Sequence, residues 1–281
     1  MSDSNIGGEA SILEERRRKL EDLRELNLAY LNNFTPANKA QELHDSHGQL
    51  SKEELEDKTI TNLSVAGRIV LKRVMGNASF VTIRDGSGDI QAYITKNNID
   101  PDLYKNFKSW DLGDIIGITG KLFKTKTEEL TVEAHSIILI TKSLRPMPEK
   151  HKGLVDIEIK YRQRYLDLMS SPESKEIFIK RSQIVSSIRA SMLADDFLEV
   201  ETPMMHSIPG GAVAKPFITK HNALDRELFL RIAPELYLKR LLVGGFDKVF
   251  EINRSFRNEG LSTRHNPEFT MLEFYAAFAS F

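Results

Sequence analysis

The sequence contains no cysteine and a single tryptophan among its 281 residues. The absence of cysteine excludes disulfide scaffolds, thiolate zinc sites and cysteine nucleophiles, and it fits a reducing compartment. Long apolar runs are also missing: the first ten residues are polar, and the longest uninterrupted apolar run, 274–279, is too short to span a bilayer. We therefore expect a soluble, cytoplasmic protein that does not bind a membrane.

Neither sign of charge dominates the sequence. Lys and Arg number 39 and Asp and Glu number 40, which gives a formal net charge of −1. This balance excludes a histone-like binder with a basic surface throughout, so any contact with nucleic acid must come from a local basic patch. With 41% hydrophobic residues the chain can form real cores, and its length favours about two domains.

Residues 1–58 are expected to form an N-terminal helical arm. Leucines recur among Glu and Arg between Ile12 and Leu31, which predicts a charged helix. This segment includes the basic run 16–19. Such a run usually forms a solvated face, and the alternative is an arm that contacts phosphates.

Residues 59–141 are predicted to form one domain of short strands. A helix at 102–110 interrupts the strands, so the order is β-β-β-α-β-β, which is typical of an OB-fold barrel. The glycines of the segment 85–88 are expected to supply the positive φ of a hairpin turn. The predicted strands are 63–74, 80–84, 89–94, 114–120, 129–134 and 136–140.

One strand of this domain shows a clean alternation. Ile90, Ala92 and Ile94 share one face, while Gln91 lies on the other. Gln91 and Phe80 are candidates for a surface that binds bases, Phe80 by stacking and Gln91 by hydrogen bonding. In the alternative interpretation Phe80 belongs to the barrel core and Gln91 is a solvated strand residue.

A proline-containing linker is expected at 142–151, followed by a second domain at 152–281. This domain should begin with a helix at 174–194 that carries an apolar stripe. Gly210 and Gly211 favour a permissive turn, and Pro234 should occupy the first position of a helix that ends near Val243. Further strands are predicted at 197–201, 228–232, 249–255 and 268–278.

Most candidate site residues of the second domain lie on or between the last two predicted strands. If they form an antiparallel hairpin, Arg257, Phe269, Glu273 and Tyr275 share one concave face, which is an unusual way to build a plain core. Each residue also has an ordinary explanation. A carboxylate in the first turn of a helix, such as Glu235, stabilises the helix dipole, while the aromatic rings pack and the charged loop residues Arg257, Glu259 and His265 pair or remain exposed.

Four sequence strings together resemble a known family. FRNEG at 256–260 with RHNPEF at 264–269 resembles motif 2 of the class II aminoacyl-tRNA synthetases, and FLEVETP at 197–203 resembles their motif 1. IPGGA at 208–212 and APELYLK at 233–239 narrow the resemblance to the bacterial-type lysyl-tRNA synthetases. The family more often has glycine just before the first phenylalanine of motif 1, where this chain has Asp196.

The resemblance implies an α+β protein in which an OB-fold barrel precedes the first part of a class II antiparallel sheet domain. It implies activation of lysine by ATP to lysyl-adenylate, with Mg²⁺ bridging the phosphates, and transfer of lysine to the 3′ end of tRNA(Lys). Arg257 is then the catalytic arginine. The residues expected at ATP are Arg257, Glu259, His265, Asn266 and Phe269. The residues expected at lysine are Gly211, Ala212, Glu235, Arg257, Glu273 and Tyr275.

The same resemblance assigns partners and an anticodon site. It implies a homodimer formed through motif 1, and it places anticodon bases against Arg73, Phe80, Gln91 and Glu129. The metal-binding carboxylates and the third motif of the family are expected beyond residue 281, so no metal ligand is expected within this chain. A fragment that binds tRNA without catalysis is the alternative function. The segment 59–141 argues against a relative that lysylates an elongation factor and lacks this domain.

Overall fold

The computed structural model describes residues 3–58, 60–148, 154, 156–260 and 262–279. The chain divides into two compact units, Met1–Leu154 and Val155–Phe281, which we describe separately. The predicted domain boundaries at residue 59 and at residues 151–152 lie outside the described residues. Within the described part of the chain, no helix is long and apolar enough to cross a membrane.

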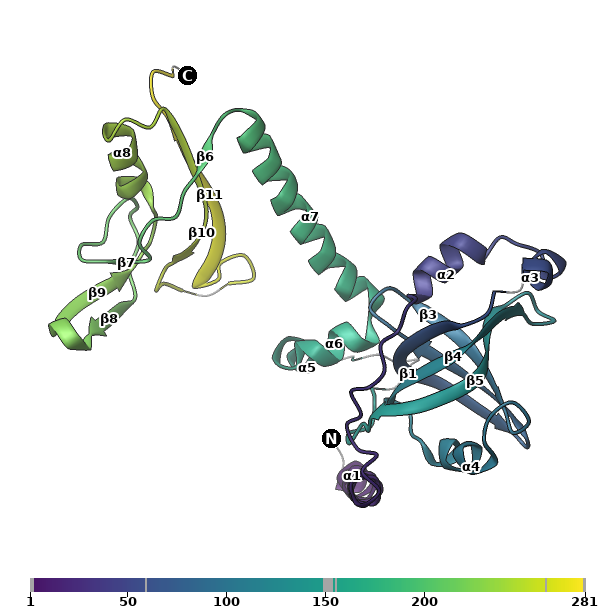
Figure 1. Cartoon of the computed structure of the whole chain (residues 1–281). Helices are drawn as coiled ribbons and strands as arrows, with labels where there is room; N and C mark the ends of the chain where they lie inside the picture. The colour runs from purple at the N-terminus through teal and green to yellow at the C-terminus, as the bar shows by residue number, and fades with distance from the viewer. Residues whose placement is uncertain (1–2, 59, 149–153, 155, 261, 280–281) are drawn as a thin grey trace. The chain divides into compact units, whose positions relative to one another are not determined.

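The first unit contains helices around a five-stranded β-barrel (Figure 1). Its helices are α1 (Asp3–Glu25), α2 (Ala40–His47), α3 (Lys52–Lys58) and α4 (Pro101–Ser109). Its strands are β1 (Leu63–Met75), β2 (Ala78–Arg84), β3 (Asp89–Thr95), β4 (Ile115–Lys124) and β5 (Leu130–Thr141). The strands close in the order β1-β2-β3-β5-β4, with α4 between β3 and β4, which confirms the predicted OB-fold order.

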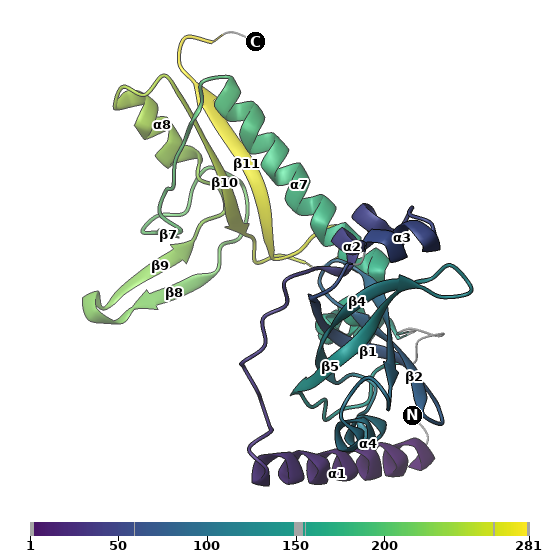
Figure 2. The ribbon, with the colours of Figure 1, turned by 45° about the vertical axis from the view of Figure 1, so that its right-hand side comes forward.

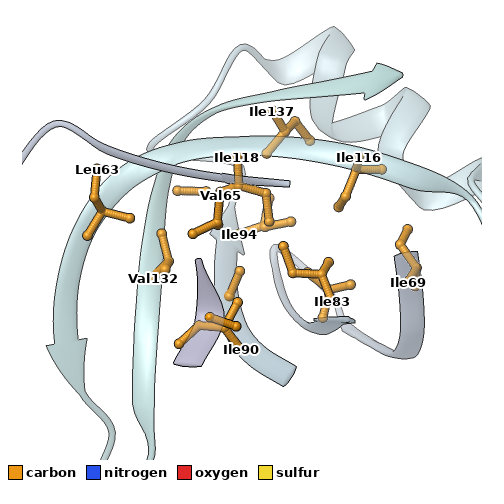
Figure 3. Close-up of a cluster of buried hydrophobic side chains, with 14 of the residues drawn as sticks. Leu63, Val65, Ile69, Ile83, Ile90, Ile94, Ile116, Ile118, Val132 and Ile137 are labelled. Atoms are coloured by element: carbon orange, nitrogen blue, oxygen red, sulfur yellow. The ribbon is translucent and has the colours of Figure 1, made fainter. Parts of the chain in front are cut away.

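Alternating inward side chains fill the barrel (Figure 3). Ile90, Ala92 and Ile94 of β3 are buried as predicted, in the same core cluster as Ile83 of β2 and Ile116 and Ile118 of β4. Phe80 is half-buried on the outer face, between the buried residues Ser79 and Val81. The interpretation of Phe80 as barrel core is therefore wrong, because its place in the β2 alternation points it outward.

Three local predictions for this unit need correction. The strands predicted at 129–134 and 136–140 are one strand, because a bulge at His135 places two successive side chains outward without ending the pairing with β4. The first helix ends at Glu25 and not near Leu31, since Asn27 takes a φ of 55°. In the β2–β3 turn no glycine has a positive φ; instead, the Asp85 carboxylate accepts hydrogen bonds from Ser87 and Gly88.

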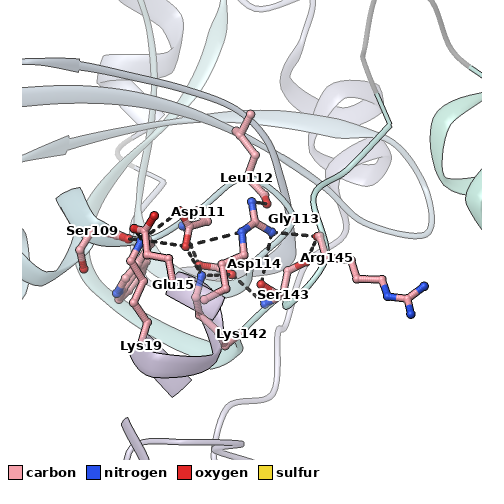
Figure 4. Close-up of polar contacts among 12 residues, drawn as sticks. Glu15, Lys19, Ser109, Asp111, Leu112, Gly113, Asp114, Lys142, Ser143 and Arg145 are labelled. Carbon is pink, nitrogen blue, oxygen red and sulfur yellow. Dashed lines mark hydrogen bonds and ion pairs between the residues drawn. The ribbon is translucent and has the colours of Figure 1, made fainter. Parts of the chain in front are cut away.

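Helix α1 passes beside α4 and is tied to the end of the barrel by a buried polar network (Figures 2 and 4). Lys142 is 2% exposed and contacts both oxygens of the fully buried Asp114, at 2.8 and 2.9 Å, as well as Asp111. From α1, Lys19 donates to Asp111 at 3.0 Å, and Arg16 donates to the backbone oxygens of Leu112, Ser143 and Arg145. Two members of the basic run 16–19 are therefore structural, while Arg17 and Arg18 remain exposed.

The second unit combines helices with two small sheets. Its helices are α5 (Ile157–Arg162), α6 (Arg164–Ser170), α7 (Pro172–Ala194) and α8 (Glu235–Val243), and a 3₁₀ turn, η1, spans Asn222–Leu224. Its strands are β6 (Leu198–Glu199), β7 (Met205–His206), β8 (Ile218–His221), β9 (Arg226–Leu230), β10 (Lys248–Phe256) and β11 (Glu268–Ala276). One sheet has the order β11-β10-β6 and the other β7-β9-β8. Pro234 is the N-cap of α8 rather than its first residue.

The apolar stripe predicted on the helix at 174–194 is present, but it is not covered. Helix α7 has 23 residues and no buried side chain within the described part of the chain. Ile177, Ile184 and Ile188 of the stripe are 66%, 60% and 38% exposed. Apolar side chains occur on the other faces of α7 as well. One neighbouring surface of this unit could therefore not bury all of them.

Candidate functional site

The first candidate site is a face of the β10–β11 hairpin. The predicted antiparallel pairing is confirmed, with Ser255 opposite Phe269 and Glu251 opposite Glu273. Residues directly opposite each other in such a pair point to the same side of the sheet. Phe269 and Glu273 lie four residues apart on one strand, a spacing of about 13 Å, so a small ligand can reach from one to the other.

One end of this face opens into a pocket of about 370 Å³. Arg257 lies half-buried in it, with its guanidinium 5.1 Å from the centre of the Phe269 ring. The buried Nε of Arg257 has no hydrogen-bond partner among the described residues. An unpaired buried donor of this kind costs free energy unless an oxygen of a ligand accepts from it. The pocket is lined by Arg257, Glu259, Gly260, Arg264, His265, Asn266, Pro267 and Phe269.

The loop between the two strands is held by backbone contacts. Asn258 N–H donates to Lys215 O at 2.7 Å, and Glu259 Oε1 accepts from Lys215 N–H at 3.1 Å. Glu259 is thus engaged by the backbone and not by an ion pair with Arg257. His265 Nδ1 lies 2.7 Å from Ser262 Oγ. The structure therefore brings together the five residues that the sequence analysis expects at the nucleotide: Arg257, Glu259, His265, Asn266 and Phe269.

The other end of the face is acidic. Tyr275 Oη donates to Glu273 Oε1 at 2.7 Å, and both side chains are half-buried. Burial raises the pKa of Glu273 above its usual range, and the negative charges of Glu235 and Glu251 raise it further. Burial and the hydrogen bond to Glu273 likewise raise the pKa of Tyr275, so this phenol stays protonated. Such a site favours a cation that restores the charge balance.

Helix α8 and a glycine turn supply the remaining acidic residue. Glu235 is the first residue of α8, and its Oε1 accepts from Lys239 Nζ at 2.6 Å. Gly211 has a φ of +88°, and a Cβ at this position would lie 2.9 Å from Glu235 Cβ. The turn predicted at Gly210–Ala212 is confirmed, and glycine is required there because Glu235 packs against it. Ala212 follows in the same turn and is half-buried.

A buried ion pair on this same face was not expected from the sequence. Arg231 Nη1 donates to Glu251 Oε1 at 2.6 Å, and both side chains are 4% exposed. Thr202 Oγ1 donates to Glu251 Oε2 at 2.6 Å, so the end of the motif 1 string is tied to β10. No local pattern identifies this pair, because its members are 20 residues apart, with Arg231 just after β9 and Glu251 on β10.

The departure from motif 1 at Asp196 has a simple geometric basis. Asp196 adopts a φ of 61°, which is the left-handed conformation that glycine adopts without strain. Aspartate is among the few other residues that tolerate this conformation. The entry turn of the motif is therefore formed here with aspartate in the position where the family more often has glycine.

The second candidate site is on the outer face of the barrel. Arg73, Phe80 and Gln91 line a single pocket of about 370 Å³, together with Thr125 and Thr127 of the β4–β5 turn. The register explains this arrangement, because Arg73 of β1 pairs with Phe80 of β2, and Gln91 of β3 pairs with Thr82 of β2. Glu129 does not line this pocket; it lies exposed in the same turn, where its N–H donates to Thr125 Oγ1.

Comparison with known proteins matches each of the two parts of the chain to a known family. Residues 63–140 match the family of OB-fold nucleic acid binding domains, and residues 156–281 match the class II tRNA synthetases of the D, K and N group. These assignments confirm the fold class expected from the sequence.

Curated relatives match nearly the whole chain. The lysine–tRNA ligase of Methylobacillus flagellatus is 59% identical over 273 residues, which cover 97% of this chain and 53% of that protein. The lysine–tRNA ligase of Azoarcus sp. is 58% identical over 285 residues, which cover 100% of this chain and 57% of that protein. The chain thus spans about half the length of the curated relatives it matches. Residues 156–281 thus match the class II tRNA synthetases of the D, K and N group, and the curated sequences that the whole chain is similar to are those of lysine–tRNA ligases.

Proposed function

We propose that the protein carrying this chain is a lysine–tRNA ligase that activates lysine with ATP and transfers it to the 3′ end of tRNA(Lys) in the cytoplasm. The observation that carries the proposal is the single face of β10 and β11. It presents Arg257 and Phe269 at one end and Glu273 and Tyr275 at the other. A nucleotide and a cationic amino acid fit these two ends, and relatives that cover the chain carry the name lysine–tRNA ligase.

In the activation step, the lysine carboxylate attacks the α-phosphorus of ATP, a new P–O bond forms and pyrophosphate leaves. The free Nε of Arg257 and the planar charge of its guanidinium suit the oxygens on which negative charge builds. Phe269 would stack on adenine, while Glu259, His265 and Asn266 contact the nucleotide from the loop. No nucleophile of the protein is needed, because positioning and charge stabilisation supply the rate.

Mg²⁺ accompanies ATP in this reaction class, where it offsets the charge of the phosphates. Among the described residues, no group of three or more His, Cys, Asp or Glu side chains is placed to bind a metal ion. We therefore assign no step of the reaction to a metal held by this chain.

Selectivity for lysine would come from the two carboxylates. Glu235, with the Gly211 and Ala212 turn beside it, suits the α-ammonium, and Glu273 with Tyr275 suits the ε-ammonium. A ligand that lacks the second ammonium group leaves the half-buried Glu273 without a cationic partner, which costs several kcal/mol of binding free energy. Such a ligand should be disfavoured relative to lysine by about 10²-fold or more. An aspartate ligand would be repelled by the same charges.

The decisive test of the proposal is lysine-dependent exchange of labelled pyrophosphate into ATP by the protein that carries this chain. Exchange that requires lysine and fails with aspartate supports the proposal. A protein that binds tRNA(Lys) but shows no exchange would instead be a tRNA-binding module.

For the barrel, we propose that the pocket formed by Arg73, Phe80 and Gln91 binds anticodon bases, with the exposed Glu129 at its edge. Replacing Phe80 by alanine should weaken charging of tRNA(Lys) about 10-fold or more, since stacking of one base on an aromatic ring contributes about 1 to 3 kcal/mol. Pyrophosphate exchange should remain unchanged. Phe123→Ala is the matched control, because Phe123 belongs to the same aromatic row through Tyr93 but does not line the pocket. An equal loss of charging and exchange in Phe80→Ala would contradict this assignment.

We also propose that the exposed apolar side chains of α7 contact a second copy of the protein, as motif 1 does in the family that the chain resembles. Such a surface is costly to leave in water. The protein should therefore sediment as a dimer, and Ile184→Asp should shift it toward the monomer because it places a charge in the interface. A monomer without any substitution would refute the proposal.

A further inference from the structure

The ammonium group of Lys239 links Glu235 of α8 to the acidic end of the hairpin face. Lys239 Nζ donates to Glu235 Oε1 at 2.6 Å and lies 5.5 Å from the centre of the Tyr275 ring. The Oη of Tyr275 in turn donates to Glu273. The four side chains form a continuous chain in which Lys239 supplies the positive charge.

The charge balance of this face depends on Lys239. Glu251 already has Arg231 as a buried partner, whereas no arginine among the described residues pairs with Glu235 or Glu273. The charge of Glu235 raises the pKa of Glu273, whereas Lys239 lowers it. Without Lys239, Glu235 and Glu273 would be two carboxylates that repel each other with no cation between them.

The side chain of Lys239 carries the same ammonium group as the proposed ligand, lysine. Lys239 presents an ammonium group to Glu235, and the α-ammonium of a bound lysine would need the same carboxylate. The side chain of Lys239 is 52% exposed, so it can swing into water without displacing packed groups. Glu235 is 30% exposed at its side chain and lies against Gly211, so it is the more fixed partner.

We propose that Lys239 is an internal counter-ion that occupies the ammonium position at Glu235 and is displaced when substrate lysine binds. The inference rests on the proposed function, because it takes the hairpin face as the lysine site. It makes Lys239 a residue that sets the affinity for lysine by competing for Glu235.

The competition predicts an increase in affinity when the counter-ion is removed. K239M should bind L-lysine about 10-fold more tightly than the unsubstituted protein, because Glu235 is then unpaired before binding. K239Q should also bind more tightly, since it keeps a hydrogen-bond donor but removes the charge. K239R should stay close to the unsubstituted protein, because it preserves the ion pair.

The measurement is isothermal titration of the full protein with L-lysine in the absence of ATP. K220M is the matched control: Lys220 of β8 forms an exposed ion pair with Asp225, the residue after η1, so its loss should leave the affinity unchanged. A larger rise in melting temperature on adding lysine to K239M than to the unsubstituted protein provides a second readout, because ligand stabilisation grows with affinity.

The outcomes separate the two proposals. If the unsubstituted protein binds lysine but K239M and K239Q bind it equally well or more weakly, Lys239 does not compete and the inference is overturned while the proposed function stands. If the unsubstituted protein binds no lysine, the lysine site itself is refuted, and the inference is refuted with it.

Discussion

Replacing Arg257 by alanine should reduce lysine-dependent pyrophosphate exchange by about 10³-fold, to the edge of detection. A charged donor aimed at developing phosphate charge contributes this much in comparable sites. The side chain is suited to the role because its buried Nε has no partner among the described residues, and its guanidinium is held over the Phe269 ring. The loss should appear mainly in kcat, since the charge it meets is greatest in the transition state.

Arg254→Ala is the control for this substitution. Arg254 lies on β10, three residues before Arg257, and it points to the opposite face, where it pairs with Glu268 at 2.5 Å. Its removal should change exchange less than about twofold, since an exposed pair contributes little. Near-normal exchange in Arg257→Ala, or equal losses in both variants, would remove Arg257 from the catalytic role.

The largest loss of stability is expected for Lys142→Met. This substitution removes the cation from a carboxylate that is fully buried, because Asp114 is 0% exposed and receives two hydrogen bonds from Lys142 (Figure 4). Breaking a buried pair from one side costs about 3 to 5 kcal/mol of the free energy of unfolding. The barrel unit should therefore unfold at a clearly lower urea concentration.

Unfolding of this unit can be followed by the fluorescence of Trp110, the single tryptophan, which is buried next to the network. Lys121→Met is the control, since it breaks the more exposed pair with Glu133 on the same barrel and should cost no more than about 1 kcal/mol. If both variants unfold at the same urea concentration, the buried network does not stabilise the barrel.

The difference in the free energy of unfolding between the unsubstituted protein and Lys142→Met should also become smaller at acidic pH. Burial alone would raise the pKa of Asp111, but hydrogen bonds from Lys142 and Lys19 hold it below its ordinary value of 3.8. A carboxyl group whose pKa is lowered on folding stabilises the folded state at pH values above its pKa in the unfolded chain. This stabilisation is lost as the pH falls through its pKa in the folded protein. We therefore expect the two unfolding curves to converge below about pH 4.

Local patterns predicted the barrel well because each of its strands alternates. Ile90, Ala92 and Ile94 are buried where period-2 geometry places them. The same reasoning failed at His135, since one extra outward residue in β5 looks like a break between strands. It failed also in the turn at 85–88, where a side-chain carboxylate, rather than a glycine conformation, organises the backbone. A bulge and an Asx-type turn depend on partners that the pattern does not contain.

The helix α7 illustrates a different limit. Its apolar residues are real, but the sequence could not say whether a neighbouring element of the same unit covers them. Amphipathic patterns report which residues tend to be buried and not what buries them. Lys239 was likewise overlooked, although its i, i+4 spacing from Glu235 is a signal that could have drawn attention to it.

The sequence by itself determined the order of strands in the barrel, the family motifs and the residue types available for a nucleotide and a doubly cationic ligand, because these depend on local spacing. Only the tertiary structure decided that Glu251 is buried with Arg231, that Phe80 faces outward beside Arg73, and that Lys239 links Glu235 to Tyr275. These contacts join separate segments, and the free energy that selects them comes from burial and charge pairing, which arise only when the chain has folded.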